Sequence, residues 1–283
     1  MSAPVAVAFF LNTESGQRFC LYRPPDNGQE SRGSVLLVPP FAEEMNKSRH
    51  MMRLLSQALA SHGYASLLID LHGCGDSEGE LKDSSWAIWK KDLAAAYAWL
   101  KQHHPRPISL LGLRLGALLA LDFLNDEKPA IKQLLLWQPV LNGQLFLTQF
   151  LRLRLAGDML SGNNEASGGT KAIRMALHAG EVIEIAGYEL APQLALPIDA
   201  LDAANYAPSA CRVDWLELQT GTDPELAPAK QKIAELWKRQ ASDLKMTPWN
   251  GPEFWASQEI SACPELIALT VQLLNQTHQA NRS

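Results

Sequence analysis

Short apolar runs and longer amphipathic stretches alternate along most of this chain. The runs are nearly all apolar, which is typical of strands that are buried on both faces. The stretches between them carry apolar residues at helical spacing, as in Trp86, Trp89 and Leu93. This alternation predicts a mostly parallel central sheet covered by helices on both faces. The predicted strands are 5–11 and 18–22 as a hairpin, then 34–38, 64–71, 108–111, 133–137, 213–218 and 243–246, and the predicted helices end near 62, 102, 124, 239 and 276.

The helix boundaries carry local signals of their own. Asn46 or Ser48 is expected to cap the helix that ends near residue 62, and Ser84 or Ser85 the next one, because such side chains accept hydrogen bonds from free N–H groups. Gly63 stands where a glycine usually follows a helix end.

The alternation breaks between residues 140 and 207. Residues 145–155 form a hydrophobic helical stretch that carries Arg152 and Arg154, and residues 171–179 look helical again. The Gly-, Ser- and Asn-rich segment 161–170 between them is expected to be mobile. We interpret 140–207 as a helical lid inserted between two parts of one core, 1–139 and 208–283. Covering a pocket is its expected role, while the two arginines leave contact with a membrane surface or a partner groove open.

Composition excludes several classes of protein. The chain has 283 residues and a net charge of −5, which argues against a general nucleic-acid binder. Its four cysteines are widely spaced, so we expect neither disulfides nor a bound metal, and no cofactor motif is present. No basic residue precedes the apolar N-terminal run and no run is long enough to span a membrane, so the expected location is the cytoplasm. The oligomeric state stays open.

The segment 108–116, I-S-L-L-G-L-R-L-G, joins a predicted buried strand to a predicted helix. A sharp turn with Gly112 and Gly116 at its two ends matches the nucleophile elbow, G-x-S-x-G, of the α/β-hydrolase superfamily. Here the central residue is Arg114. A guanidinium has five hydrogen-bond donors and no acceptor, and it does not lose its proton in a protein. The sequence therefore predicts the architecture of a serine hydrolase without its nucleophile.

The order of elements resembles the α/β-hydrolase superfamily across nearly the whole chain. Four segments resemble one group within it more closely: P-P-F-A-E-E-M-N-K-S-R at 39–49, G-L-R-L-G-A at 112–117, F-L-R-L-R-L at 150–155, and 180–188. Together they are similar to the exosortase A system-associated hydrolases of the second type. The resemblance implies an α/β-hydrolase fold with a helical lid, a hydrolase label, and an association with exopolysaccharide production and protein-sorting loci.

The same resemblance assigns the positions of a catalytic triad. The acid follows the strand after the lid, and Asp223, in G-T-D, is the best match there. The base is a histidine after the last strand, but 247–255 contains none. Trp249, Phe254 and Trp255 are expected to cover the pocket at that place instead. Because a triad acts as a unit, the absence of its serine and its histidine favours loss of catalysis over a relocated triad.

The oxyanion hole of the predicted fold is better preserved. Its two N–H donors would come from Phe41 and Leu115. A buried cation needs a counter-charge, so Glu43, Glu44 or Asp223 is expected beside Arg114. If one of these acids fills the site, Arg114 is a structural plug. If none does, the site suits a small anion or an acyl ligand.

Other nucleophiles are weaker candidates. Cys74 and His72 lie on one glycine-rich loop, but their spacing of two residues favours simple loop packing over a catalytic pair. Two functions therefore remain open. One is a protein that binds a small anionic or acyl ligand in the former active site, and the other is an ester, thioester or glycan-acyl hydrolase with an unorthodox site.

Overall fold

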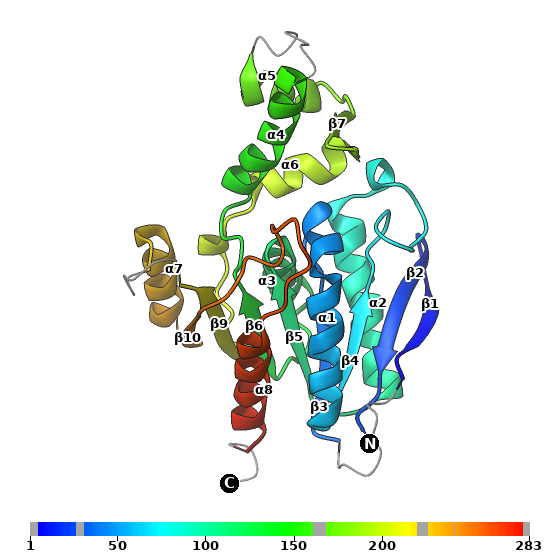
Figure 1. Ribbon diagram of the computed structural model, residues 1–283, viewed down its shortest axis with the longest axis vertical. Helices are drawn as coiled ribbons and strands as arrows, with labels where there is room; N and C mark the ends of the chain where they lie inside the picture. Colours follow the sequence, from blue (N-terminus) through cyan, green and yellow to red (C-terminus); the bar gives the residue numbers. More distant parts are fainter. Residues whose placement is uncertain (1–4, 27–30, 161–167, 220–225, 241, 280–283) are drawn as a thin grey trace.

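The computed structural model describes residues 5–26, 31–160, 168–219, 226–240 and 242–279. Within them one sheet has the strand order β1-β2-β4-β3-β5-β6-β9-β10 (Figure 1). The pairs from β4 to β10 are parallel, while β1 and β2 add an antiparallel hairpin at one edge. The mostly parallel sheet predicted from the apolar runs is thus confirmed. Its strands are β1 (Val7–Thr13), β2 (Gly16–Arg23), β3 (Gly33–Val38), β4 (Tyr64–Ile69), β5 (Ile108–Leu113), β6 (Gln133–Trp137), β9 (Arg212–Leu218) and β10 (Asp243–Trp249).

Helices cover both faces of the sheet and enclose two apolar layers (Figure 1). One layer contains Leu37, Leu111 and Trp137 from the central strands, and the other contains Leu36 and Leu110. Neighbouring positions on a strand face opposite sides, so the continuous apolar runs supply both layers at once. The helices on the first face are α1 (Glu43–Ser61) and α8 (Pro264–Gln279), those on the second are α2 (Trp86–His103), α3 (Leu115–Glu127) and α7 (Pro228–Arg239), and short 3₁₀ helices occur at η1 (Leu81–Asp83) and η2 (Ala203–Asn205).

The helix starts agree with the sequence in one case and correct it in the other. Ser85 caps α2, where its hydroxyl accepts a hydrogen bond from the Ile88 N–H at 3.1 Å. The predicted caps of α1 are wrong, because α1 begins at Glu43 and its N-cap is Ala42, whose side chain makes no cap hydrogen bond. Glu43 and Glu44 stand in the first turn instead, where negative charge complements the helix dipole.

A cap segment, residues 143–200, stands above the carboxyl ends of the strands (Figure 1). Its two ends run side by side, since the Gly143 N–H donates to the Leu201 carbonyl at 2.8 Å and the Ala203 N–H to the Leu141 carbonyl at 2.7 Å. Of the segment expected to be mobile, 161–167 lies outside the described residues. The cap segment contains α4 (Gly143–Leu160), α5 (Gly169–His178), β7 (Ile183–Ile185), β8 (Tyr188–Leu190) and α6 (Pro192–Ala200).

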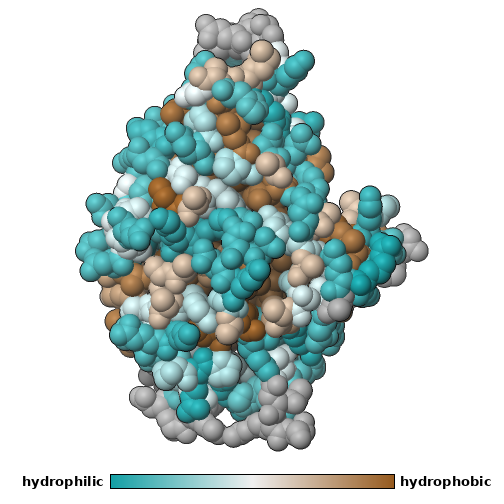
Figure 2. Space-filling view, turned by 180° about the vertical axis from the view of Figure 1, so that it is seen from behind, coloured by the Kyte–Doolittle hydropathy of each residue, from teal (hydrophilic) through white to brown (hydrophobic). Residues whose placement is uncertain are grey.

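The surface seen from behind is mostly hydrophilic, with apolar side chains scattered over its upper part, where the cap segment lies (Figure 2). The exposed large apolar residues of the cap include Leu145, Met159 and Met175. Among the helices that the structure describes, none is both long enough and apolar enough to cross a membrane.

Candidate active site

The turn between β5 and α3 has the backbone of a nucleophile elbow. Arg114 stands at its tip with φ 56° and ψ −120°, a conformation that costs a non-glycine residue on the order of 1–3 kcal/mol. Hydrogen bonds hold it there. The Arg114 N–H donates to the Trp137 carbonyl, and its own carbonyl accepts from Ala117 and Val140, each at 3.1 Å. The turn is therefore fixed by the strand beside it and by the helix that follows.

The two glycines of the elbow are required by close backbone contacts. A Cβ on Gly116 would lie 2.3 Å from the Pro39 carbonyl oxygen, and a Cβ on Gly112 would lie 2.5 Å from the Ala117 Cα. Real Cβ atoms do not approach backbone atoms so closely. The glycine positions that marked the elbow in the sequence thus have the packing role expected of them.

The side chain of Arg114 is paired with Glu44. Its Nε and Nη2 atoms each lie 3.1 Å from the Glu44 Oε1, and its guanidinium carbon lies 5.6 Å from the centroid of the Trp255 ring. Of the three acids expected beside Arg114, the structure brings Glu44 to it. Glu43 turns toward the cap segment and accepts a hydrogen bond from the Tyr188 hydroxyl at 3.1 Å. Asp223 lies outside the described residues.

Glu44 is only half satisfied by this pair. Its second oxygen, Oε2, is buried and has no hydrogen-bond partner among the described residues. Burial raises the pKa of Glu44 above its usual value, although the neighbouring Arg114 guanidinium acts in the opposite direction. The charge of Arg114 is therefore balanced by a carboxylate that takes up a proton more readily than an exposed glutamate.

The oxyanion position lies between the elbow and the end of β3. No acceptor among the described residues meets the N–H groups of Phe41 and Leu115. Ala42, next to Phe41, has φ 52° and ψ −126°, so a second strained turn faces the elbow. Positive φ is uncommon for residues other than glycine, and at active sites such strain often accompanies a fixed geometry. The two N–H donors predicted from the sequence are thus free among the described residues.

Aromatic side chains pack around Phe41, beside the oxyanion position. The ring of Phe41 lies 4.9 Å from Phe150 and 5.9 Å from Phe146, both on α4 of the cap segment, and 5.9 Å from Trp89 on α2. The recess left between the Phe41 ring and the elbow has a volume of about 10 Å³, which is room for roughly one water molecule. A larger apolar ligand therefore requires Phe41 or α4 to move.

No histidine takes the place of the triad base in the described residues. Residues 247–263, from the last part of β10 onward, contain none. Of the aromatic residues there, Trp255 contacts Arg114, while Trp249 and Phe254 are buried in the layer beneath α1 and α8. Within the same described residues, no group of three or more His, Cys, Asp or Glu side chains is arranged to hold a metal ion.

Cys74 and His72 do not form a catalytic pair. The His72 Nδ1 lies 3.0 Å from the Ser84 hydroxyl, and burial together with the charge of Arg18 lowers the pKa of His72. Burial, with the nearby carboxylates of Asp70 and Asp92, raises the pKa of the Cys74 thiol to about 12. A thiol with its pKa raised in this way is a poor nucleophile, which agrees with the packing role expected for Cys74 beside the recess.

Two contacts of the site go beyond what the sequence predicted. Trp255 was expected to cover the pocket, and the structure places its ring against the Arg114 guanidinium. The link from Glu43 and Asn46 on α1 to Tyr188 in the cap segment, made by hydrogen bonds of 3.1 Å and 3.2 Å, had no signal in the sequence. Burial and the adjacent Glu43 carboxylate raise the pKa of Tyr188 to about 12. Both contacts join distant parts of the chain, which periodicity and motif spacing do not report.

Comparison with known families agrees with this geometry. A model of the Hydrolase_4 family, described as serine aminopeptidase S33, matches residues 29–171, which is half of the chain. The chain belongs to this family. The match includes the elbow, Phe41, Glu44 and the beginning of the cap segment.

Individual relatives and solved structures extend the comparison. The chain is 29% identical over 119 residues to a protein named acyl transferase from Shewanella woodyi, covering 41% of this chain and 38% of that protein. A second acyl transferase, from Aliivibrio fischeri, is 26% identical over 119 residues, again 38% of its length. The chain thus matches about two fifths of the length of these relatives.

Among solved structures, a carboxyl esterase from Bacillus coagulans gives a TM-score of 0.65 at 13% identity, covering 98% of this chain and 100% of that one. Est1E from Butyrivibrio proteoclasticus, with bound ferulic acid, gives 0.62 at 14% identity, covering 96% and 100%. At such identities the likeness concerns the fold alone. The α/β-hydrolase fold predicted from the sequence is confirmed.

Proposed function

We propose that this family member is a binding protein for a small anionic or acyl ligand, and that it does not act as a serine esterase. The observation that carries the proposal is Arg114 at the tip of the elbow, held by Glu44 and Trp255. A guanidinium has no lone pair to attack an acyl carbon. What the elbow retains is a positive field without a nucleophile.

Three features of that field favour an anion. The N-terminus of α3 carries about half a positive elementary charge, and the free N–H groups of Phe41 and Leu115 lie beside it. Arg114 adds a full charge and a planar set of donors that suits a carboxylate, sulfate or phosphate. In a serine hydrolase the same donors stabilise a short-lived oxyanion. Here they would hold a stable one.

Glu44 competes with such a ligand and sets its pH dependence. An entering anion displaces the Glu44 carboxylate from Arg114, and the displaced carboxylate is left buried. Because burial raises the pKa of Glu44, protonation removes this competitor at a pH above that of an ordinary glutamate. Anion binding is therefore coupled to proton uptake and strengthens as the pH falls from neutral toward the pKa of Glu44.

The acyl part of the proposal rests on the surroundings of the elbow. Phe41, Phe146 and Phe150 provide an apolar wall, and the relatives named acyl transferase support an acyl ligand. The recess is nearly full, so α4 would open to admit a chain. We further propose that the protein belongs with the exosortase A system-associated hydrolases of exopolysaccharide loci, on the strength of the P-P-F-A-E-E-M-N-K-S-R segment.

Sulfate titration tests the binding function, because sulfate keeps one charge state over the useful pH range. We expect the melting temperature to rise with sulfate beyond a chloride control of equal ionic strength, and more strongly at pH 5.5 than at pH 7.5. Glu44→Gln should bind about tenfold more tightly at pH 7.5 and lose the pH dependence, while Arg114→Met should lose binding. Arg152→Met, an exposed change in the cap segment, is the control. If sulfate raises the melting temperature no more than chloride does, in the parent and in Glu44→Gln alike, the anion-binding proposal is wrong and Arg114 has only a structural role.

The second candidate is an ester, thioester or glycan-acyl hydrolase with an unorthodox site, which family membership favours. A fluorophosphonate probe and a panel of short-chain p-nitrophenyl esters separate the two functions. Our expectation is neither covalent labelling nor turnover above the Arg114→Met background. Stoichiometric labelling of any serine in the pocket would establish the hydrolase and end the binding-only proposal.

A further inference from the structure

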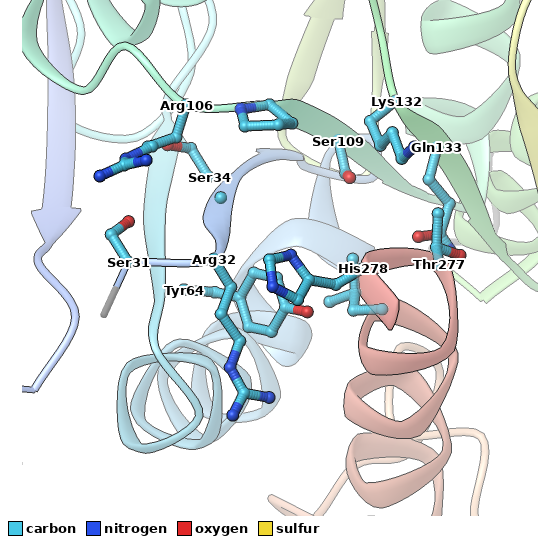
Figure 3. Close-up of a pocket in the computed structure, with 13 residues that line it drawn as sticks. Ser31, Arg32, Ser34, Tyr64, Arg106, Ser109, Lys132, Gln133, Thr277 and His278 are labelled. Carbon is cyan, nitrogen blue, oxygen red and sulfur yellow. The ribbon is translucent and has the colours of Figure 1, made fainter. Parts of the chain in front are cut away.

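A second cavity lies at the amino ends of β3, β5 and β6, whereas the elbow follows the carboxyl end of β5 (Figure 3). Its volume is about 340 Å³, within the range of small-ligand sites. Ser109 and Gln133 face it from the strands, and His278 reaches it from α8 on the other side. Neither the family nor the elbow explains this cavity, because the ligand sites of α/β sheets lie at the carboxyl ends of strands.

The strands that reach this cavity begin with polar residues. Ser109 and Gln133 are adjacent in the sheet register and are 5% and 1% exposed. The next positions on the same face, Leu111 and Leu135, belong to the apolar layer beneath α1 and α8. The apolar pattern is thus interrupted where the cavity opens, and a hydroxyl and an amide stand in a layer that is otherwise hydrocarbon.

Gln133 is held in one orientation and has an unused acceptor. Its Nε2 donates to the Asp214 Oδ2 at 2.6 Å, so exchanging the amide nitrogen and oxygen would set an oxygen against a carboxylate. Its Oε1 is therefore fixed as the other atom of the amide, and it is buried without a partner among the described residues. Buried polar atoms in folded proteins are normally satisfied. This oxygen is suited to accept a hydrogen bond from a ligand.

The rim of the same cavity is positively charged. Arg32, Arg106 and Lys132 line it, and no aspartate or glutamate does so among the described residues (Figure 3). None of the ion pairs among the described residues includes these three cations, although Arg32 donates to the Asn275 side chain at 2.7 Å. The carboxyl end of α8 adds only about half a negative charge. On a chain with a net charge of −5, this cavity is a local positive region.

We propose that this cavity binds a small anion that also carries a hydroxyl group, such as the phosphate monoester of a polyol. Arg106 and Lys132 neutralise the phosphate at the rim, where a Lys or Arg contacts phosphate oxygens directly. Gln133 accepts a hydrogen bond from the ligand hydroxyl, and Ser109 donates or accepts beside it. Cations alone would take any anion, so the buried acceptor is what selects the hydroxylated one.

Isothermal titration with glycerol 3-phosphate tests the proposal. The Arg114→Met protein is used throughout, so that the elbow does not contribute. We expect saturable binding that Lys132→Gln and Arg106→Gln each weaken by at least about tenfold, while Lys101→Gln, an exposed change at the end of α2, leaves it unchanged. Propyl phosphate, which lacks the hydroxyls, should bind at least about fivefold more weakly, and glycerol should not bind.

Two variants test the role of the buried acceptor. Gln133→Met should bind glycerol 3-phosphate and propyl phosphate equally. Ser109→Ala is a smaller change that keeps the contact of Gln133 with Asp214, and it serves as the second test if Gln133→Met does not fold. It should reduce the preference for glycerol 3-phosphate over propyl phosphate. No saturable binding, or binding that neither rim variant weakens, would overturn the proposal. Equal affinity for the two phosphates in the starting protein would reject the hydroxyl-selective site. Binding to the unsubstituted protein that is absent from the Arg114→Met protein would assign the ligand to the elbow instead.

Discussion

At the scale of single residues, Arg114 puts a permanent charge at the tip of the elbow. The turn still carries a strained residue at its tip, two glycines at its ends and free N–H groups beside it. In a hydrolase this geometry presents an oxygen to the substrate, whereas here it presents a permanent charge. The charge is stabilised by Glu44 and Trp255, and part of the side chain is exposed to solvent. The properties of the site therefore follow from the protonation state of Glu44.

Replacing Arg114 with Met should destabilise the protein in a pH-dependent way. The pKa of Glu44 is raised in the fold from a usual value of 4.5, and losing the guanidinium raises it further. At low pH the carboxyl is neutral in both proteins and the difference is small. As the pH rises through the pKa of Glu44, the parent gains an ion pair and the variant acquires an unpaired buried charge. We expect a loss of about 1–2 kcal/mol at pH 7, since both side chains are partly exposed.

Urea unfolding of both proteins between pH 4 and pH 8 measures this difference. Glu44→Gln and Glu44→Gln/Arg114→Met are the matched controls, and the loss that Arg114→Met causes in the Glu44→Gln background should not vary with pH over that range. A stability difference for Arg114→Met that is the same at every pH would mean that the Glu44 pair contributes nothing.

Gly116→Ala should be costly although alanine favours helices. The new Cβ would lie 2.3 Å from the Pro39 carbonyl oxygen and 2.6 Å from that of Val38, both backbone atoms with little room to move. Overpacking of this kind costs about 1–3 kcal/mol. Gly157→Ala on α4, where a Cβ meets nothing within 4 Å, should instead gain up to about 1 kcal/mol. Thermal unfolding of the pair checks this contrast, and equal effects would contradict the close approach at the elbow.

The elbow motif in the sequence predicted the central residues of this site, but not the contacts made by residues far away in the chain. Arg114 and its need for an acid followed from the elbow, and Glu44 was among the acids expected beside it. Trp255 was expected only to cover the pocket, and its contact with the guanidinium was not predicted, because the turns after β10 leave no periodic pattern. Asp223 stays a prediction.

At the scale of elements, the predicted strands and helices agree with the structure where burial sets the pattern. The last strand is longer than expected, because β10 extends to Trp249 through Pro248. A proline lacks an N–H, but β10 is an edge strand, where one missing donor costs no ladder hydrogen bond. The start of α1 was also misplaced, because it carries no side-chain cap. Side-chain caps mark many helices, whereas this one begins with a strained Ala42 and a pair of acids.

The three helices of the cap segment are tied together by Arg174. From α5, its guanidinium contacts Asp199 on α6 at 2.8 Å, and on α4 the Thr148 hydroxyl and the Gln144 carbonyl, each at 3.0 Å. Arg174→Met removes these charge-assisted bonds while keeping most of the side chain's apolar length. We expect the local stability of the cap segment to fall by about 1–2 kcal/mol, with the core unaffected.

Amide hydrogen exchange of Arg174→Met provides the measurement. Exchange should accelerate in α4, α5 and α6 and stay unchanged in β5, and Arg152→Met, an exposed change on α4, should alter neither. Uniform acceleration in the cap segment and in β5 would show that the two unfold together and that Arg174 does not hold a separate unit.

At the scale of the whole molecule, the cap segment is joined to the core through a narrow base. An antiparallel bridge links Asn142 to Asp202, and flanking backbone hydrogen bonds hold the two connecting segments, 141–143 and 201–203, side by side. The contacts above this base include Phe146 and Phe150 against Phe41, Tyr188 with Glu43, and the ion pair of Lys82 with Glu189. We propose on these grounds that 140–207 is an inserted lid and that 1–139 with 208–283 is a core able to fold without it.

Excising the lid tests this division and separates the two kinds of ligand. Replacing 144–200 with a short Gly-Ser linker keeps the bridge at Asn142 and Asp202, so the remaining chain should unfold cooperatively at a lower melting temperature. Phe41 then becomes exposed, which should increase binding of a hydrophobic dye. Sulfate binding should persist, because Arg114 and the free N–H groups belong to the core, whereas octanoate binding should weaken with the loss of Phe146 and Phe150. An excised protein without a cooperative transition would mean that 140–207 is an integral part of the core.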